Sequence, residues 1–177
     1  MILPIKKILI SREELEQRIT SLADEINQAY RGEELVLISV LKGSVMFLTG
    51  LMKELDIDVE IGFLYLSSYQ GETAPQTKIN HYHLPFPDIK NRNVLLVEDI
   101  LDSGASLACA FDICQHKEPT SLKTCVLLVK KDCKKTKTPP VDFKGFDIPN
   151  EFVVGYGLDH REKYRQLPYI AVPDISD

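Results

Sequence analysis

Short apolar runs alternate with segments whose apolar positions recur at helical spacing along most of the chain. Ser11 followed three residues later by Glu14 has the spacing of a capping box, in which each residue's side chain binds the other's backbone amide. The apolar positions after it recur every three or four residues as far as Gly32, a typical stop signal: Leu15, Ile19, Leu22 and Ile26. The first periodic segment is therefore predicted to be a helix.

Further along the chain, apolar runs predict strands at residues 35–41, 59–66, 94–97 and 124–129, with two short strands in residues 152–159 and 169–172. Helical patterns follow the first and third of these strands, to about Leu55 and about His116. Ser67 to Lys78 loses all periodicity and predicts a long mobile loop. Pro85 and Pro87 exclude an uninterrupted central strand between His81 and Asn93.

Strands that alternate with helices favour an α/β fold, with a central, mostly parallel sheet flanked by helices. We expect one domain over residues 1–177. In such sheets ligands bind at the carboxyl ends of the strands. Four predicted strands end in polar or charged segments: Lys42-Gly43, Ser68-Tyr69, Glu98-Asp99 and Lys130. The sequence therefore predicts that these segments share one site.

Composition narrows the function classes. The 177 residues carry a formal net charge of −5 with a pI near 5.4, which argues against a nucleic-acid partner. No apolar run is long enough for a bilayer and the start lacks a signal-peptide pattern, so we expect a cytoplasmic protein without a membrane partner. The four cysteines form no CxxC pair and indicate free thiols. His81 and His83 lack further ligands for a metal and indicate a solvated loop.

The segment from Val94 to Ser106 carries the clearest chemistry. A buried strand is expected to bring Glu98 and Asp99 to its exposed end, where two carboxylates need a cation such as Mg²⁺ or a sugar diol. The following residues offer a glycine turn, two hydroxyls and the amides of a helix N-terminus, which favour a phosphate: Asp102, Ser103, Gly104, Ala105 and Ser106. For an isolated acidic pair, helix capping in water would be the simpler interpretation.

The order of apolar strand, acidic pair, Asp102, Ser-Gly and helix closely matches the signature of type I phosphoribosyltransferases. Over nearly its whole length the chain resembles the bacterial hypoxanthine (hypoxanthine-guanine) phosphoribosyltransferases of that family. Leu41-Lys42-Gly43 is similar to the family's pyrophosphate loop, Ser68-Tyr69 to its mobile flap and Lys130 to its purine-reading lysine. Residues 152–159 and 163–165 resemble its base-binding and closing segment. The family fold adds a small hood formed by terminal segments.

The resemblance implies a role for each matching residue. Asp102 would be the catalytic acid or base at purine N7. Glu98 and Asp99 would hold the ribose hydroxyls and Mg²⁺, and Asp159 a second Mg²⁺. The remaining implied contacts are to the 5-phosphate by Asp102, Ser103, Gly104, Ala105 and Ser106, to pyrophosphate by Lys42, Gly43, Ser68, Tyr69 and Arg165, and to the purine by Lys130, Phe152, Val153 and Asp159.

The activity that the resemblance implies belongs to purine salvage. The 5-phosphoribosyl group of phosphoribosyl pyrophosphate would pass to hypoxanthine or guanine, giving IMP or GMP and pyrophosphate, with Mg²⁺ as cofactor. The family also implies a homodimer or homotetramer and a cis peptide bond at Leu41-Lys42. Ser67, Ala105 and the Asn80 to Asn93 stretch depart from the family pattern, and a local rearrangement is expected in that stretch.

Three alternatives stay open at the level of sequence. A regulator could use the same fold to sense phosphoribosyl pyrophosphate while binding nucleic acid, although the acidic pI argues against it. A related transferase could act on xanthine or adenine, although Lys130 favours a 6-oxo group. A receiver-like signalling domain also places acids and a lysine at strand ends, but it has no place for residues 102–106 or 152–159.

Overall fold

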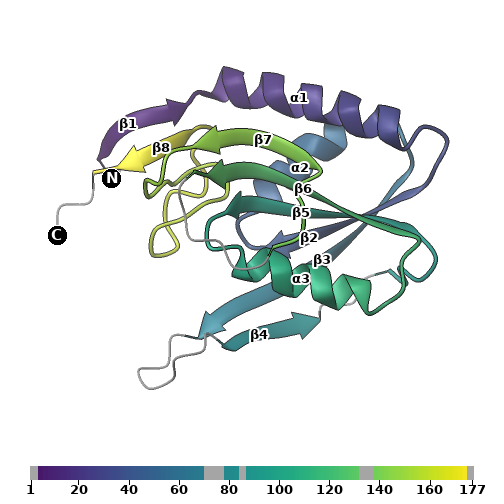
Figure 1. The fold of residues 1–177 in the computed structure, drawn as a ribbon. Coiled ribbons are helices and arrows are strands. Elements are labelled where there is room, and N and C mark those ends of the chain that lie inside the picture. The colour runs from purple at the N-terminus through teal and green to yellow at the C-terminus, as the bar shows by residue number, and fades with distance from the viewer. Residues whose placement is uncertain (1–3, 70–77, 84–86, 132–137, 175–177) are drawn as a thin grey trace.

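A computed structural model describes residues 4–69, 78–83, 87–131 and 138–174 (Figure 1). Six strands form one sheet in the order β4-β3-β2-β5-β6-β7, in which every neighbouring pair is parallel except β3 with β4. The strands are β2 (Leu35–Leu41), β3 (Val59–Tyr69), β4 (Lys78–His83), β5 (Asn93–Leu101), β6 (Ser121–Lys130) and β7 (Phe143–Ile148). The predicted α/β fold with a mostly parallel sheet is confirmed.

Helices cover both faces of this sheet. Figure 1 shows α1 (Arg12–Ala29) and α2 (Val45–Glu54) on one side and α3 (Ala105–Gln115) on the other. Leu35 and Leu37 of β2 pack with α1 and α2, whereas Val36 and Ile38 pack with α3. Because successive strand residues point to opposite faces, a strand covered on both sides needs an unbroken apolar run. This explains why the sequence predicted β2 with its observed bounds.

The start of α1 is fixed by the predicted capping box. The Glu14 amide donates to Ser11 Oγ at 3.2 Å, and the Ser11 amide donates to Glu14 Oε2 at 2.7 Å. The buried stripe of the helix consists of the predicted apolar residues together with one alanine: Leu15, Ile19, Leu22, Ala23 and Ile26. Gly32 follows with a φ of +79°, a conformation that glycine adopts without strain.

The two ends of the chain form a second, small sheet. Strand β1 (Ile5–Ile10) pairs antiparallel with β8 (Ile170–Pro173), which confirms the predicted hood of terminal segments. An isolated bridge between Val154 and Ala171 joins residues 152–158 to β8. The strand predicted at residues 152–159 was wrong, since this segment is a loop with isolated bridges. Its two glycines, Gly155 and Gly157, both have a positive φ, which interrupts an extended strand.

The predicted loop from Ser67 to Lys78 was wrong at both ends. Strand β3 continues to Tyr69, and Lys78 begins β4, whereas residues 70–77 lie outside the described part. His81 and His83 therefore belong to β4 rather than to a loop, because pairing with β3 orders this polar segment. Strand β4 is an edge strand and ends before Pro85, as expected of a segment with nearby prolines.

Three of the cysteines lie in the described residues and are free thiols: Cys109, Cys114 and Cys125. Burial raises the pKa of Cys114 to about 12, so this thiol stays protonated. Cys133 lies outside the described residues. Within the described part of the chain, no helix has the length and apolar character needed to cross a membrane.

Candidate functional site

The carboxyl ends of the parallel strands bring the predicted site residues to one edge of the sheet. Asp102 directly follows β5, and Lys130 is the last residue of the neighbouring β6. Lys130 Nζ donates to Asp102 Oδ2 at 2.6 Å, with the lysine side chain 9% exposed and the aspartate side chain 54% exposed. A cation and a carboxylate that lie 28 residues apart in sequence therefore meet at the edge of a solvent-accessible site.

Glu98 and Asp99 point to opposite faces of the sheet because they are consecutive in β5. Glu98 Oε1 accepts a hydrogen bond from Ser106 Oγ of α3 at 3.0 Å, and its buried Oε2 has no hydrogen-bond partner among the described residues. Asp99 Oδ1 accepts from the Ile100 amide at 2.8 Å. The expectation that both acids lie at an exposed strand end was wrong: β5 continues to Leu101, and both acids are buried.

Burial controls the protonation of this acidic pair. It raises the pKa of Glu98 well above its usual range, with a further rise from Asp99 and a partial opposing effect of the Ser106 hydrogen bond. It also raises the pKa of Asp99 to about 6, against the lowering effects of backbone hydrogen bonds and the Arg165 cation. An acidic pair held away from water in this way is poised to receive a cation or hydroxyl donors.

The turn after β2 lies directly against Asp99. The Leu41-Lys42 peptide bond is cis, as the sequence resemblance implied. A Cβ atom on Gly43 would overlap Asp99 Oδ2, so any other residue here would force the Asp99 carboxylate to move. Gly157 in turn lies so close to the Gly43 carbonyl oxygen that a side chain there would overlap it. Segments after β2, in β5 and before β8 are thus packed together at one place.

The turn after β5 ends at the N-terminus of α3. Gly104 is the N-cap residue with a φ of +83°, and a Cβ atom there would overlap Thr138 Cγ2. Ser103 precedes it, and Ala105 and Ser106 begin the helix, so the predicted phosphate-loop residues span this turn and the first residues of α3. The amides at a helix N-terminus have no partner within the helix and attract anions.

A second group of charges lies on the turn that follows residues 152–158. Arg165 Nη1 donates to the Gly157 carbonyl at 2.7 Å, and Arg165 Nη2 pairs with Asp159 Oδ1 at 2.9 Å. Glu162 contacts two cations at once, Arg165 Nη2 through Oε2 at 3.1 Å and Lys42 Nζ through Oε1 at 3.1 Å. These contacts lower the pKa of Glu162, with the Arg165 hydrogen bond as the main cause.

The predicted purine residues differ in burial. The Phe152 side chain is 49% exposed and so does not belong to the core. Its ring packs edge-on against the His160 ring, with 5.5 Å between the ring centroids. Val153 is buried beside it. Ser68 and Tyr69 lie at the end of β3, where their backbones pair with Ile79 and Lys78 of β4.

One residue of this site was missed by sequence reasoning. Glu162 lies in the run Arg161-Glu162-Lys163, which looks like an ordinary solvated stretch of mixed charge. Its position depends on the turn from Asp159 to Arg165 and on the distant Lys42, and neither contact leaves a local pattern in the sequence. The only available signal was the position of Glu162 between residues 152–159 and 163–165, which resemble the family's base-binding and closing segment.

The acidic residues fit Mg²⁺ that is held mainly by a substrate. The part of the chain that the structure describes contains no cluster of three or more His, Cys, Asp or Glu able to hold a metal by itself. Mg²⁺ commonly uses one or two protein carboxylates and completes its shell with water and substrate phosphates. The unpartnered Oε2 of Glu98 and the carboxylates of Asp99 and Asp159 supply oxygen donors of this kind.

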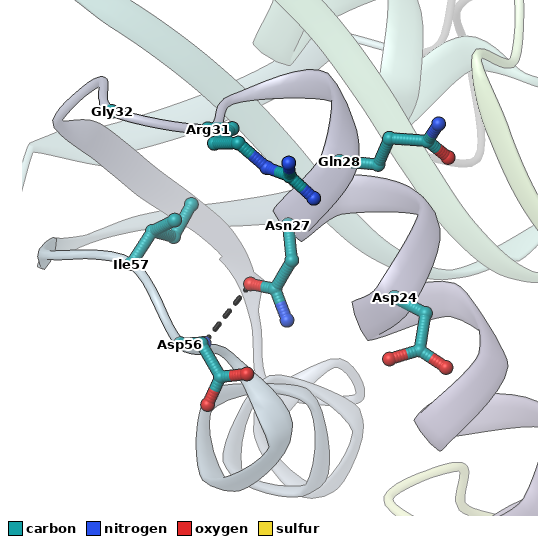
Figure 2. A pocket seen from close by; sticks show the side chains of 7 residues that line it. All are labelled: Asp24, Asn27, Gln28, Arg31, Gly32, Asp56 and Ile57. Atoms are coloured by element: carbon teal, nitrogen blue, oxygen red, sulfur yellow. Dashed lines mark hydrogen bonds between the residues drawn. The ribbon is translucent and has the colours of Figure 1, made fainter.

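A cavity of about 470 Å³ lies elsewhere, near the amino ends of β2 and β3 (Figure 2). Its lining residues are Asp24, Asn27, Gln28, Arg31, Gly32, Asp56 and Ile57. Asn27 Oδ1 accepts from the Asp56 amide at 2.9 Å, and Asn27 Nδ2 donates to the Glu54 carbonyl at 3.3 Å. Asn27 therefore joins α1 to the segment after α2, which is a structural role, and ligand sites of parallel sheets lie at the other edge.

Comparison with known proteins agrees with this geometry. The profile of the phosphoribosyl transferase domain family matches residues 8–161. A hypoxanthine-guanine phosphoribosyltransferase of Streptococcus pneumoniae is 42% identical over 168 residues, which cover 95% of this chain and 93% of the relative. The chain belongs to the hypoxanthine-guanine phosphoribosyltransferase family.

Solved structures of other members of this family have the same fold. A hypoxanthine-guanine phosphoribosyltransferase of Bacillus anthracis superposes with a TM-score of 0.88 at 41% identity, covering 95% of this chain and 98% of that one. A hypoxanthine phosphoribosyltransferase of Staphylococcus aureus gives a TM-score of 0.89 at 36% identity, covering 96% and 91%. These matches confirm the phosphoribosyltransferase fold predicted from the sequence. They exclude the alternative of a receiver-like signalling domain.

Proposed function

We propose that this phosphoribosyltransferase transfers the 5-phosphoribosyl group of phosphoribosyl pyrophosphate to hypoxanthine or guanine, giving IMP or GMP and pyrophosphate in purine salvage. The observation that carries the proposal is the 2.6 Å pair between Lys130 and Asp102. The 6-oxygen and N7 of a 6-oxopurine lie side by side on one edge of the ring. A lysine and a carboxylate held in contact can therefore bind the two atoms at once, the lysine at the 6-oxygen and the carboxylate at N7.

Asp102 is proposed as the acid-base group. A carboxylate beside N7 can accept the ring proton as the new glycosidic bond forms at N9, and it can return the proton in the reverse reaction. Its side chain is 54% exposed, which leaves it accessible to a bound base. Lys130 would donate to the 6-oxygen and stabilise negative charge that moves onto the ring. Phe152 would stack on the base, Val153 would offer backbone groups to its edge, and Asp159 would complete the purine site.

The sugar and its phosphate are assigned to the strand and turn at β5. Glu98 and Asp99 would accept hydrogen bonds from the ribose hydroxyls and hold Mg²⁺, and Asp159 would hold a second ion. Bound Mg²⁺ supplies neutralisation of the diphosphate charge as the leaving group departs. The hydroxyls and amides of residues 103–106, together with the N-terminus of α3, would bind the 5-phosphate.

The leaving pyrophosphate is assigned to the segments around the Gly43 turn. Lys42 and Arg165 would supply cations, Gly43 a backbone amide, and Ser68 and Tyr69 a flap that closes over the substrates. Closure excludes water, which would otherwise capture the oxocarbenium-like sugar and hydrolyse the donor. We also expect a cytoplasmic enzyme that forms a homodimer or homotetramer, does not bind nucleic acid or membranes, and has one domain over residues 1–177.

A coupled assay with Mg²⁺ and phosphoribosyl pyrophosphate tests the proposal. Hypoxanthine, guanine, xanthine and adenine are offered as separate substrates, and nucleotide formation is followed for each. We expect turnover with hypoxanthine or guanine and none with adenine, whose 6-amino group would face the Lys130 ammonium donor to donor. Preferred use of adenine, or no turnover together with a salt-dependent complex with RNA or DNA, would overturn the proposal.

A further inference from the structure

Glu162 contacts both cations that are assigned to pyrophosphate. Its Oε1 accepts from Lys42 Nζ at 3.1 Å, and its Oε2 accepts from Arg165 Nη2 at 3.1 Å. Lys42 and Arg165 come from segments more than a hundred residues apart, and this one carboxylate joins them. The contacts lie at or near the surface, with exposed side-chain fractions of 66% for Glu162, 50% for Lys42 and 25% for Arg165. An anion arriving from solvent can therefore reach the same two cations.

A tight turn holds Glu162 in this position. The Glu162 amide donates to Asp159 Oδ2 at 2.8 Å, and His160 pairs with Lys163 across the turn. Arg161 and Glu162 have φ values of +53° and +62°, which non-glycine residues adopt infrequently. The backbone of the turn is thus fixed by contacts that do not involve the Glu162 side chain. Changing this side chain should leave the turn in place.

We propose that Glu162 is an internal anion, which occupies the cationic position between Lys42 and Arg165 until the diphosphate of the substrate displaces it. The inference rests on the proposed function, since it takes Lys42 and Arg165 as pyrophosphate ligands. Glu162 then weakens the binding of phosphoribosyl pyrophosphate and of pyrophosphate. It also returns to the cations as pyrophosphate leaves, which favours release of the product.

The strengths of the contacts make this exchange feasible. Exposed ion pairs are weak because water and salt screen them, so breaking the two Glu162 pairs requires little free energy. A diphosphate carries more charge than one carboxylate and presents several oxygens to the guanidinium, so it forms stronger, charge-assisted contacts with the same cations. A diphosphate can therefore displace the Glu162 carboxylate from Lys42 and Arg165.

The opposite role is the natural rival, namely that Glu162 positions Lys42 and Arg165 for the diphosphate. The two roles predict opposite signs. Loss of a competing anion tightens diphosphate binding, whereas loss of a positioning contact weakens it. A change from Glu to Gln separates them, since it keeps the size and the hydrogen-bond acceptor of the side chain and removes its charge.

The test measures binding of inorganic pyrophosphate with Mg²⁺ to the full chain by titration calorimetry, for wild type and Glu162→Gln. We expect the dissociation constant of pyrophosphate to fall roughly threefold to tenfold, from the loss of two weak ion pairs. In steady state the KM for phosphoribosyl pyrophosphate should fall as well, while the KM for the base stays unchanged. An unchanged or larger dissociation constant for pyrophosphate overturns the inference.

Two controls make the result specific. Glu60→Gln makes the same change of charge in another pair at the surface, Glu60 with Arg92. This pair lies near the amino ends of the strands, away from the site, so the change should leave pyrophosphate binding unchanged. In a Lys42→Met background, Glu162→Gln should tighten pyrophosphate binding by a smaller factor, since one of the two cations for which Glu162 and pyrophosphate compete is absent. Equal tightening by Glu60→Gln, or an undiminished effect without Lys42, would assign the effect to net charge and overturn the inference.

Failure of the inference is distinguishable from failure of the proposed function. If the wild-type chain forms nucleotide from a 6-oxopurine and binds pyrophosphate, the function holds whatever Glu162→Gln does. If the wild-type chain neither turns over nor binds pyrophosphate, the function itself fails, and the inference fails with it.

Discussion

The charges at the two sides of the site are balanced in different ways. On β5, Glu98 and Asp99 are buried, and among the described residues neither forms an ion pair; burial raises the pKa of both. Around them, every assigned cation with a described side chain already has a carboxylate of this chain: Lys130 has Asp102, Lys42 has Glu162, and Arg165 has both Asp159 and Glu162. The acidic side, Glu98 and Asp99, thus has no ion-paired cation among the described residues, although Arg165 lies near enough to lower the pKa of Asp99. On the other side, here called the paired side, each of these cations has its own carboxylate.

This difference corresponds to the charge of what each side is proposed to bind. Two buried carboxylates without a cation are unfavourable in the free protein, and ligands that bring Mg²⁺ and hydroxyl groups relieve that cost. The cations of the paired side are already stabilised by carboxylates, so an arriving anion must displace one of those carboxylates. We therefore expect neutralising substitutions on the acidic side to stabilise the free protein. Neutralising substitutions on the paired side should alter binding or turnover and have little effect on stability.

The largest expected effect is on turnover, at the paired side. Asp102→Asn should lower kcat by roughly a hundredfold or more, as expected for the loss of an acid-base group. Binding of phosphoribosyl pyrophosphate should change little, because the side chain keeps its size and Asn can still accept from Lys130. Steady-state kinetics with hypoxanthine, together with titration of the donor, measure both quantities. Unchanged turnover would show that the Lys130–Asp102 pair is structural and would remove Asp102 from the catalytic role.

Asp99→Asn should stabilise the free protein, in a way that depends on pH. The pKa of Asp99 is raised to about 6 in the folded protein, against about 3.9 for an unfolded aspartate, so the folded state binds the proton more tightly. The penalty for the buried charge is then complete above pH 6 and disappears as the pH falls toward 4. We expect the variant to gain about 3 kcal/mol in free energy of unfolding at pH 8, and much less at pH 4.5.

Denaturant unfolding at several pH values, with a chelator present to remove Mg²⁺, measures this gain. The exposed Asp24→Asn provides a matched control that should show no such dependence. A gain that stays constant from pH 8 to pH 4.5 would indicate that the stabilisation does not come from ionisation of Asp99. A loss of stability at pH 8 would mean that the buried acid is already compensated, and the contrast between the two sides would disappear.

The sequence predicted the elements whose pattern is local. The unbroken apolar run of β2 reflects a strand buried on both faces, and the spacing of Ser11 and Glu14 reflects a cap made within four residues. β4 and β7 were not predicted as strands. The first is a polar edge strand ordered by β3, and the second, Phe143–Ile148, has an exposed or half-buried interior and a glycine.

For the candidate site, too, the sequence predicted which residues take part but not the contacts that depend on the fold. The resemblance and the ends of the strands indicated that Asp102 and Lys130 lie in one site, but their direct contact depends on the pairing of β5 with β6. Burial of Glu98 and Asp99 was not visible, because it depends on how far β5 continues beneath the Gly43 turn. Glu162 was missed for the same reason, since its partners are brought together only by the fold.

A smaller effect on stability is expected from Ser106→Ala on the acidic side. Ser106 Oγ donates to Glu98 Oε1, and this is the hydrogen bond that the structure gives to the Glu98 carboxylate. Its loss leaves a buried carboxylate with still less compensation, which should lower the free energy of unfolding at pH 8 by about 1 kcal/mol. Combining it with Glu98→Gln provides the control, since removal of the charge should reduce this loss. An equal loss in both backgrounds would assign the effect to α3 itself.

The smallest expected effect is that of Glu162→Gln on thermal stability. The Glu162 side chain is 66% exposed, so water and salt screen both of its pairs, and without it Arg165 still pairs with Asp159. The midpoint of thermal unfolding should therefore move by less than about 2 °C without ligand, measured by calorimetry at two salt concentrations. The same variant is expected to bind pyrophosphate more tightly, so its effects on stability and on binding should separate. If Glu162→Gln instead lowered the midpoint as much as loss of a buried contact, the turn would depend on Glu162 itself. The ion pairs of the paired side would then stabilise the fold, rather than supply carboxylates that a substrate can displace.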